Sequence, residues 1–451
     1  MSGAVVLLLL GACRSYEPAP VDLAAHAREF AVRLPDATAL RTFLPPSAAE
    51  AAVGALSLDD GLSRREGRML AAALHPSCRM ARAEAAAAAA RTKHAGKLAD
   101  PELAVSFERI LETVPHRWLT ATSLGIGVPL GGRLGAERDL ADAELVVALT
   151  ELRLAEEHAA HALDVAWIEW SAAASRLACT RNLCTRLTEL SGIAKRLAEA
   201  GAATTMQARA FELELLERRL EADRQADELA LAALAVNERL GLAPTATPSL
   251  LPELPERPFG EDGSERRRSA VAGPRTATAD AAHATAERRL ALEIARQRPE
   301  LMLAPGWSEE DAQPRATFGF SLPLPLWNRN AGPIAAAEAD RAVAAEGLRA
   351  AVEHAEHVLA AAERRYAAAV RRVRDRCAEL LPLAERQLTD AKRLAELGTL
   401  DPFLVLDALV RVHDAEQQLL TDAERAAIAA VELDTFAWTD PLPMPVPGTA
   451  R

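Results

Sequence analysis

Aromatic residues are scarce in this sequence. Nine Phe, six Trp and two Tyr make up only 4% of the 451 residues, although 50% of the chain is hydrophobic. Alanine and leucine fill that gap. They are good helix formers, whereas aromatic side chains are the large fillers of thick cores. The length would suit about three ordinary domains, but this composition indicates long helices packed side by side.

The chain also lacks an excess of positive charge and any long apolar run. Its 52 Lys and Arg against 64 Asp and Glu give a net charge of −12. This balance excludes nucleic acid as an expected partner, because binding it needs clustered basic residues. No apolar run reaches the ~18–20 residues of a membrane-spanning helix, which excludes an inner-membrane transporter.

Catalytic motifs are missing as well. The sequence contains no glycine-rich phosphate loop, no H-E-x-x-H and no nucleophile elbow. We therefore expect a protein that is not an enzyme and needs no cofactor.

Cysteine is rare, with five residues in the chain. Cys179 and Cys184 lie five positions apart in a helical stretch, which places them on different helix faces. That placement suits neither an easy disulfide nor a zinc site formed by this pair. We expect both, together with Cys78 and Cys377, to be buried small thiols.

The N-terminus resembles a secretion and lipidation signal. The run Val5–Leu10 reads VVLLLL, and such a short apolar core followed by small residues is typical of a signal peptide. Residues 10–13, Leu-Gly-Ala-Cys, are similar to a bacterial lipobox, in which the cysteine is acylated and becomes the first mature residue. We expect a signal peptide at 1–12 and a lipidated (palmitoylated) extension at 13–56, attached through Cys13. Arg14 in place of Asp favours the outer membrane.

One departure from this pattern is that residues 1–4 carry no Lys or Arg, so the positive segment of a signal peptide is missing. A translation start placed a few codons late would explain it. The alternative is a cytoplasmic protein with an apolar N-terminus.

The sequence is duplicated. Residues 194–201 read AKRLAEAG and residues 391–398 read AKRLAELG, while LGIGVPL at 124–130 aligns with FGFSLPL at 318–324. The matches occur in the same order at nearly the same offset, which indicates a repeated unit of about 200 residues. We expect a first repeat at 57–240, a linker at 241–276, a second repeat at 277–440 and a disordered tail at 441–451.

Each repeat contains strand-like alternation. Large apolar residues alternate with small ones through 124–130 and again through 318–326. This period is typical of a transmembrane β-barrel strand, and an ordinary half-buried strand has the same pattern. The weaker partner strands contain Leu103, Val105, Phe107, Leu301 and Leu303. Four strands per chain cannot close a barrel, so they would need partner chains.

Long helices follow the strands. Residues 134–199 contain no Pro, and residues 334–397 contain only Gly347 and Pro382 as breakers. At 1.5 Å per residue each helix would extend roughly 100 Å and pack like a coiled coil.

The repeated glycines Gly201 and Gly398 are natural helix ends, so we expect them in hairpin-tip turns. The chain would return through 206–240 and 403–438. Lead-in helices are expected at 59–91 and 277–295.

Further motifs occur in a specific order. They are Leu-Ser-Leu-Asp at 56–59, PLPLWNRN at 323–330, GPIAAAE at 332–338 and LVLDAL at 404–409. With the duplication and the lipobox, they make the chain resemble the TolC-type outer-membrane efflux channel family. The likeness is greatest to its lipidated, heavy-metal efflux members and covers residues 56 to about 433.

This resemblance implies a mainly α fold with a small β part. Three chains would form a homotrimer with a twelve-stranded outer-membrane barrel and a helical tunnel across the periplasm. The implied function is passive export of metal ions or small toxic compounds, driven by an inner-membrane pump and a periplasmic adaptor. The alternative is a coiled-coil adaptor (membrane fusion protein), which would have one hairpin flanked by β-rich modules.

The resemblance also implies a periplasmic gate just past Gly398. The matching residues are Phe403 for an apolar ring and Asp407 for an acidic ring, four positions apart on one helix face. Three copies of Asp407 would repel one another and attract cations. The alternatives are a solvated Asp407 and a Phe403 that packs in a helix seam.

A repeated histidine pattern is the remaining candidate. Glu-His-Ala-Ala-His at 157–161 recurs as Glu-His-Ala-Glu-His at 353–357. The pairs His158 with His161 and His354 with His357 have i, i+3 spacing and could share a soft or borderline metal ion. A solvated Glu/His face explains the same pattern, and we expect no resident metal.

Overall fold

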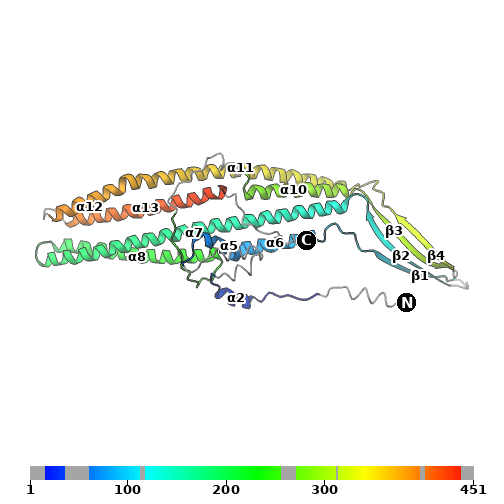
Figure 1. The fold of residues 1–451 in the computed structure, drawn as a ribbon, viewed down its shortest axis with the longest axis horizontal. Helices are drawn as coiled ribbons and strands as arrows, with labels where there is room; N and C mark the ends of the chain where they lie inside the picture. Colours follow the sequence, from blue (N-terminus) through cyan, green and yellow to red (C-terminus); the bar gives the residue numbers. More distant parts are fainter. Residues whose placement is uncertain are drawn as a thin grey trace.

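The computed structural model shows a rod of long helices that carries a small β-sheet at one end (Figure 1). The chain is therefore mainly helical with a small β part, as the sequence predicted. The described residues are 16–35, 60–111, 117–254, 271–310, 313–396 and 402–437. The expected signal peptide, Cys13, the 56–59 motif, Gly398 and the tail 441–451 lie outside these ranges.

The first repeat consists of two strands and a long helical hairpin. Its elements are β1 (Glu102–Arg109), β2 (Trp118–Pro129), α7 (Arg133–Glu199) and α8 (Thr205–Leu240). The 67 residues of α7 lead to Gly201, whose φ of +73° forms the tip turn. Glycine suits this turn because it adopts positive φ without steric cost. Thr204 then caps α8 through a reciprocal capping box with Gln207.

The helices that lead into the first repeat are shorter than expected. A single helix over 59–91 was a wrong prediction, because the chain forms α5 (Arg64–Leu74) and α6 (Pro76–Thr92). His75 between them has extended backbone angles. Proline disfavours a helical conformation in the preceding residue but is well suited to the first position of a new helix. An earlier helix, α2 (Leu23–Ala31), is capped by Asp22.

The second repeat has the same order of elements. They are α10 (Pro274–Ala295), β3 (Glu300–Glu310), β4 (Gln313–Ser321), α11 (Ala331–Asp375), α12 (Leu381–Glu396) and α13 (Pro402–Ala437). A π-helical turn, Arg376–Leu380, joins α11 to α12. Pro382 explains it, because a proline ring clashes with the carbonyl four residues earlier and a wider turn relieves that contact. Among the described residues, no helix has a stretch apolar enough to cross a membrane.

The alternating segment of the second repeat is shorter than expected. The strand ends at Ser321, so the predicted continuation through Leu322 to Leu326 was wrong. Pro323 and Pro325 supply the reason, because proline has no N–H to donate to a strand ladder.

Both repeats contribute to one sheet. The strand order is β1-β2-β3-β4 and every pair is antiparallel. The central ladder joins β2 of the first repeat to β3 of the second, with Ile126 opposite Leu303. On the outer side Leu303 faces Phe320 of β4. The sheet thus fastens the two hairpins together at this end of the rod.

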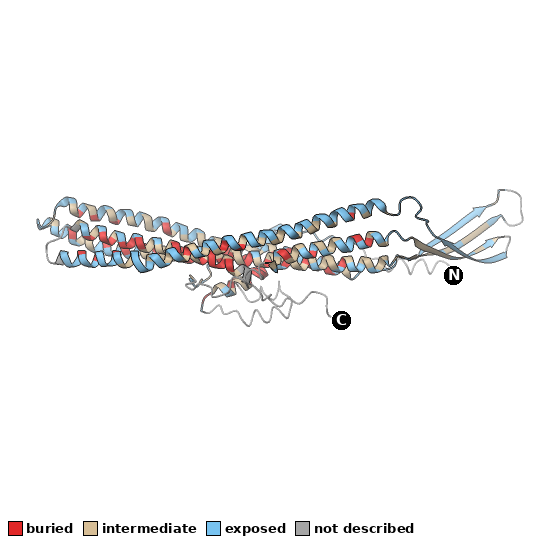
Figure 2. Cartoon of the chain, turned by 90° about the horizontal axis from the view of Figure 1, so that it is seen from above, coloured by how far each residue is buried: buried red, intermediate tan, exposed pale blue. Residues whose placement is uncertain are grey.

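Buried residues gather in the middle of the rod (Figure 2). Trp167 of α7 is fully buried, and its Nε1 donates a hydrogen bond to the Leu251 carbonyl at 2.9 Å. Around it lies one apolar cluster, formed by Leu62, Leu70, Ala71, Ala73, Leu74, Leu163, Ala166, Val236, Leu240, Leu242, Ala243 and Ala246. A second cluster joins α7, α8, α12 and α13 through Leu183, Leu187, Leu215, Ala384, Leu388, Ala391, Val405, Ala408, Leu409 and Val412.

Two buried carboxylates are compensated by arginine. Asp164 of α7 accepts a hydrogen bond from Arg68 Nε at 2.9 Å, with Arg64 Nη1 3.8 Å away. Asp422 of α13 accepts one from Arg372 Nε at 3.2 Å. Both acids are 2% exposed. Burying such a charge without a partner would be costly, so these pairs tie the neighbouring helices together.

Replacing Trp167 tests the central cluster. Trp167→Ala is expected to lower the free energy of unfolding by about 3–5 kcal/mol, because it leaves a cavity and removes the donor to Leu251. Trp167→Phe retains most of the apolar volume and should cost only about 1–3 kcal/mol. Loss of helical circular dichroism on unfolding in detergent measures both. Equal, small losses for the two variants would contradict this assignment of the core.

Candidate functional site

The sheet has one apolar face that runs across all four strands. Residues paired directly across antiparallel strands point to the same face. The observed register therefore places on one face the apolar residues Leu103, Val105, Phe107, Trp118, Leu124, Ile126, Val128, Leu301, Leu303, Trp307, Phe318 and Phe320. Arg109, Thr120, Thr122 and Glu309 belong to the same face, toward its Trp118 end. Small and polar residues occupy the opposite face, including Ala104, Ser106, Ser123, Gly125, Gly306, Thr317 and Gly319.

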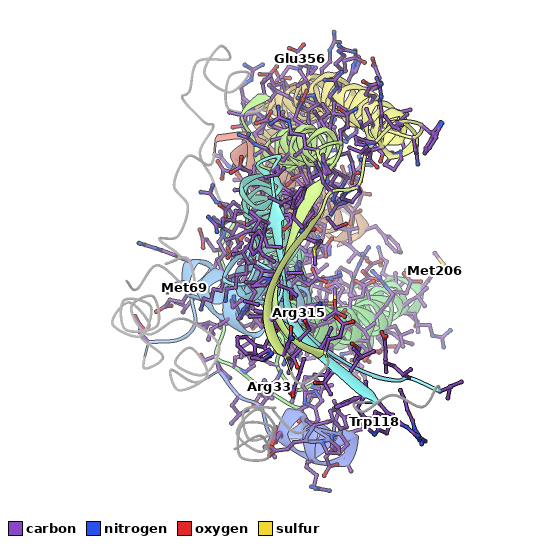
Figure 3. All side chains as sticks on the ribbon, turned by 90° about the vertical axis from the view of Figure 1, so that its right-hand side faces the viewer. Arg33, Met69, Trp118, Met206, Arg315 and Glu356 are labelled. Atoms are coloured by element: carbon purple, nitrogen blue, oxygen red, sulfur yellow. The ribbon has the colours of Figure 1, made fainter. Side chains whose placement is uncertain are left out.

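This apolar face is open to its surroundings. Phe320 is 72% exposed, Phe318 71% and Phe107 69%. In the end-on view of Figure 3 the strands that carry Trp118 and Arg315 lie in front of the helices. An exposed apolar surface of this extent marks a contact with lipid or protein.

The structure places both predicted gate residues, Phe403 and Asp407, on α13. Asp407 is exposed on α13, and its Oδ2 accepts a hydrogen bond from Arg411 Nε at 2.7 Å. Phe403 lies one turn earlier and is half-buried. Arg411 was missed by the sequence analysis, although its i, i+4 spacing from Asp407 is a recognisable signal. In the first repeat Met206 lies just beyond the tip turn and is 72% exposed (Figure 3).

A cavity of about 320 Å³ brings three of the four candidate histidines together. His158 and His161 of α7 face His354 of α11 across it, whereas His357 is exposed and does not line it. Two further lining residues were missed by sequence reasoning, namely Arg275 of α10 and Glu432 of α13. They lie more than a hundred positions from His158, so no local pattern could have found them.

The cavity disfavours added charge. Burial raises the pKa of Glu157 to about 7, with Arg275 opposing the rise. Its Oε2 is buried and makes no hydrogen bond. Burial also lowers the pKa of His158, and Arg275 lowers it further. Burial lowers the pKa of His161 as well, although Asp164 opposes that effect.

The side chains of these histidines are not arranged as a metal site. Arg275 Nη2 lies 3.2 Å from His158 Nε2, so a guanidinium occupies the position next to that ring nitrogen. Within the described ranges, the ligand atoms of these histidines do not come close enough for three of them to share an ion.

Comparison with known proteins identifies the fold. No protein-family model and no curated protein matches the chain. Three solved structures with a similar fold are the outer-membrane channel OprN, the outer membrane protein VceC from Vibrio cholerae, and CusC, described as undergoing conformational changes on folding and transmembrane channel formation.

The similarity extends over most of each structure. OprN is 16% identical, with a TM-score of 0.68, 94% of this chain and 97% of that chain covered. VceC is 16% identical, with a TM-score of 0.67 and coverage of 83% and 95%. CusC is 15% identical, with a TM-score of 0.68 and coverage of 83% and 91%. The predicted resemblance to TolC-type outer-membrane channels is thus confirmed at the level of the fold.

The raised pKa of Glu157 predicts a pH dependence of stability. The folded state holds this proton more tightly than the unfolded state, so stability falls as pH rises from about 4.5 to about 7 and stays low above that. Glu157→Gln removes the free-energy cost of ionising this buried carboxyl group. We expect it to raise the free energy of unfolding at pH 8 by about 1 kcal/mol, a figure reduced for solvent access, and to change little at pH 4.

Thermal unfolding at the two pH values measures this difference. The matched control is Glu353→Gln, the equivalent and exposed position in the second repeat, which should leave stability unchanged at both. Equal effects of the two substitutions would show that burial of Glu157 carries no penalty.

Proposed function

We propose that this protein is the outer-membrane channel of a tripartite efflux system and acts as a passive export duct without catalysis. The observation that carries this proposal is the exposed apolar face of a four-stranded sheet placed at the end of two long helical hairpins, with both sheet edges unpaired by any described strand. The shared fold with solved outer-membrane channels supports it.

The open edges of the sheet favour a homotrimer. Among the residues that the structure describes, β1 and β4 each have a neighbouring strand on one side only. In lipid every backbone N–H and C=O must be satisfied within the protein, so an isolated four-stranded sheet is not stable there. Three copies, joined β4 to β1, would give a closed barrel of twelve strands. Closure removes every edge.

The apolar face has the height that a membrane requires. Along β2 this face extends from Trp118 to Val128, which is ten steps or ~34 Å at ~3.4 Å per residue. It includes Thr120 and Thr122, and the charged Arg109 and Glu309 lie opposite Trp118 and Thr120 at one end. A strand tilted by ~40° would then cover ~26 Å, close to the ~25 Å apolar band of outer-membrane barrels. The small and polar residues of the other face would line the lumen.

The helices suit a conduit across the periplasm. α7 alone, with 67 residues, extends ~100 Å from the sheet to the tip at Gly201. At that end we propose contacts with a periplasmic adaptor and an inner-membrane pump. Two hairpins sharing one sheet favour the channel over an adaptor, which would have one hairpin and compact β-rich modules.

The proposals for the lipid anchor and for the exported compounds rest on the resemblance to lipidated efflux channels. We propose that a signal peptide at 1–12 is removed and that Cys13 carries the lipid in the outer membrane. The likeness to heavy-metal efflux members makes metal ions or other small toxic compounds the proposed cargo.

The hairpin tips are the proposed gate. In a trimer Asp407 and Phe403, which share one face of α13, would form an acidic and an apolar ring near the periplasmic entrance. Arg411, which pairs with Asp407, would offset part of the negative charge.

A lysine on the apolar face tests the barrel. Phe318→Lys, opposite Pro305 near the middle of the apolar face, is expected to cost about 2–4 kcal/mol and to abolish the heat-resistant trimer in outer-membrane fractions. Thr317→Lys, on the opposite face of the same strand, should leave the trimer intact because its charge would project into the lumen. A trimer that tolerates the first substitution but not the second would reverse the proposed orientation of the sheet.

Charge changes at the tip test the gate. Asp407→Asn should lower the cation preference of the channel in planar bilayers about twofold to fivefold, corresponding to ~0.4–1 kcal/mol for an exposed charge. Arg411→Gln should raise that preference, because it frees the same carboxylate. Asp390→Asn, an exposed acid on α12, is the control and should change nothing. If all three variants keep the ion selectivity of the unaltered channel, Asp407 is not a gate residue.

A further inference from the structure

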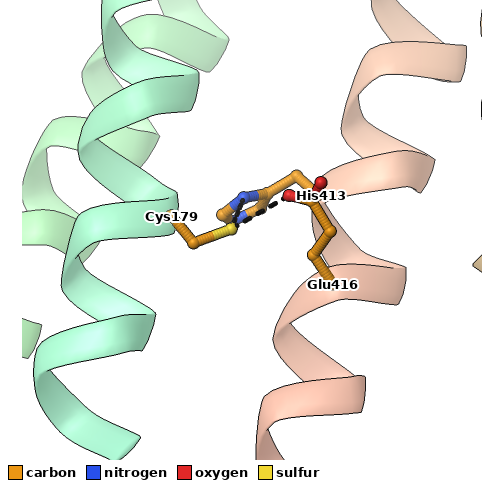
Figure 4. A group of neighbouring side chains, drawn as sticks. All are labelled: Cys179, His413 and Glu416. Carbon is orange, nitrogen blue, oxygen red and sulfur yellow. Dashed lines mark hydrogen bonds between the residues drawn. The ribbon is translucent and has the colours of Figure 1, made fainter. Parts of the chain in front are cut away.

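A cysteine, a histidine and a glutamate meet where the two repeats touch in the wall of the rod. Cys179 belongs to α7 of the first repeat, and His413 and Glu416 belong to α13 of the second (Figure 4). Cys179 Sγ lies 3.4 Å from His413 Nδ1 and 3.1 Å from Glu416 Oε2. Within the described part of the chain, these are the three potential ligand atoms that gather within 4.8 Å of one another.

The spacing of these atoms is close to that of a tetrahedral zinc site. With Zn–S of about 2.3 Å and Zn–N or Zn–O of about 2.0 Å, neighbouring ligand atoms lie about 3.5 Å apart. The observed separations of 3.4 Å and 3.1 Å need only small outward movements to admit the ion. His413 and Glu416 have i, i+3 spacing on α13, so one helix face presents both.

The donor types and their exposure also fit zinc. Thiolate, imidazole and carboxylate together form a set that Zn²⁺ binds, leaving a fourth position for water. His413 is only 3% exposed, so its orientation is set by packing. Cys179 and Glu416 are half-buried, which leaves a route by which an ion can enter from solvent.

Neighbouring contacts hold the two helices in register at this point. Gln417 Nε2, next to Glu416, donates hydrogen bonds to the Arg176 carbonyl and to Thr180 Oγ1, each at 2.9 Å. Arg176 in turn forms an ion pair with Glu424 of α13. The ligand side chains therefore project from a backbone that is already positioned.

A Cys–His contact is also found at nucleophilic cysteines, which is the alternative interpretation of this cluster. Such a cysteine needs a lowered pKa, because the thiolate is the reactive form. Here burial, the hydrogen bond to Glu416 and the charge of that carboxylate together raise the pKa of Cys179 to about 12. The environment is thus the opposite of a catalytic one.

We propose that Cys179, His413 and Glu416 bind one zinc ion, which links the outgoing helix of the first hairpin to the returning helix of the second. On binding, the Cys179 S–H bond breaks, the sulfur forms a bond to Zn²⁺, and the proton passes to solvent. No oxidation or reduction takes place. The site is separate from the His158 cavity and does not depend on the nature of the exported cargo.

The test uses the purified full chain in detergent, stripped of metal with a chelator and titrated with Zn²⁺ alone. We expect one zinc ion per chain, release of a proton on binding, and a rise in Tm because the ion binds the folded state. Co²⁺ in place of zinc should show a thiolate-to-cobalt charge-transfer absorption. Cys179→Ser is expected to weaken zinc binding about tenfold or more and to abolish that absorption.

Cys184→Ser is the matched control. It lies on the same helix, five positions away and outside the cluster, and should retain the stoichiometry, the affinity and the Tm rise of the unaltered chain. Because His413 is buried and its replacement can unfold the chain, Glu416→Gln serves as the second ligand variant. It keeps the shape of the half-exposed side chain and should also weaken binding about tenfold.

Three outcomes would overturn the proposal. The folded chain could bind no zinc, Cys179→Ser could bind zinc as tightly as the unaltered chain, or bound cobalt could lack the thiolate absorption. Zinc held at the histidine cavity would produce the second outcome and would be lost in His158→Ala.

Discussion

The pairing of β2 with β3 is the interaction on which the rest of the structure depends. It is the backbone ladder that joins the two repeats, with Ile126 opposite Leu303, and it places all four strands in one sheet. Because each long hairpin is continuous with its own strands, a shared sheet forces the hairpins to run alongside each other. The apolar clusters between α7, α8, α12 and α13 then form between helices that are already aligned.

The scarcity of aromatic residues follows from this architecture. In a rod of helices packed side by side the interfaces between helices are narrow. Its buried positions are therefore occupied mainly by alanine and leucine. Trp167, at the centre of the rod, and Phe211 of α8 are buried aromatic exceptions. Several large aromatic side chains lie instead on the sheet, where Phe107, Trp307 and Phe320 are more than half exposed. An exposed apolar surface of this kind is typical of a contact with lipid or with another protein.

Charge is handled in two ways inside the rod. Asp164 and Asp422 are buried against arginines, so their ionised forms are compensated and they tie helices together. Glu157 and Cys179 are different, since burial raises the pKa of each and favours the protonated form. Glu157 lies in the cavity beside the histidines and Cys179 at a contact between the repeats, so a proton at the first place and a cation at the second would change the balance of charge there.

The sequence by itself determined the duplication, the strand segments, the long helices and the tip turn at Gly201, because each rests on a local pattern of apolar spacing or on glycine and proline. Two wrong predictions also trace to proline. The predicted helix over 59–91 breaks before Pro76, and strand β4 ends before Pro323. Only the tertiary structure decided which strands pair, that Arg275 enters the histidine cavity, and that Cys179 meets His413. Those contacts join residues 117 and 234 positions apart, and no local periodicity encodes them.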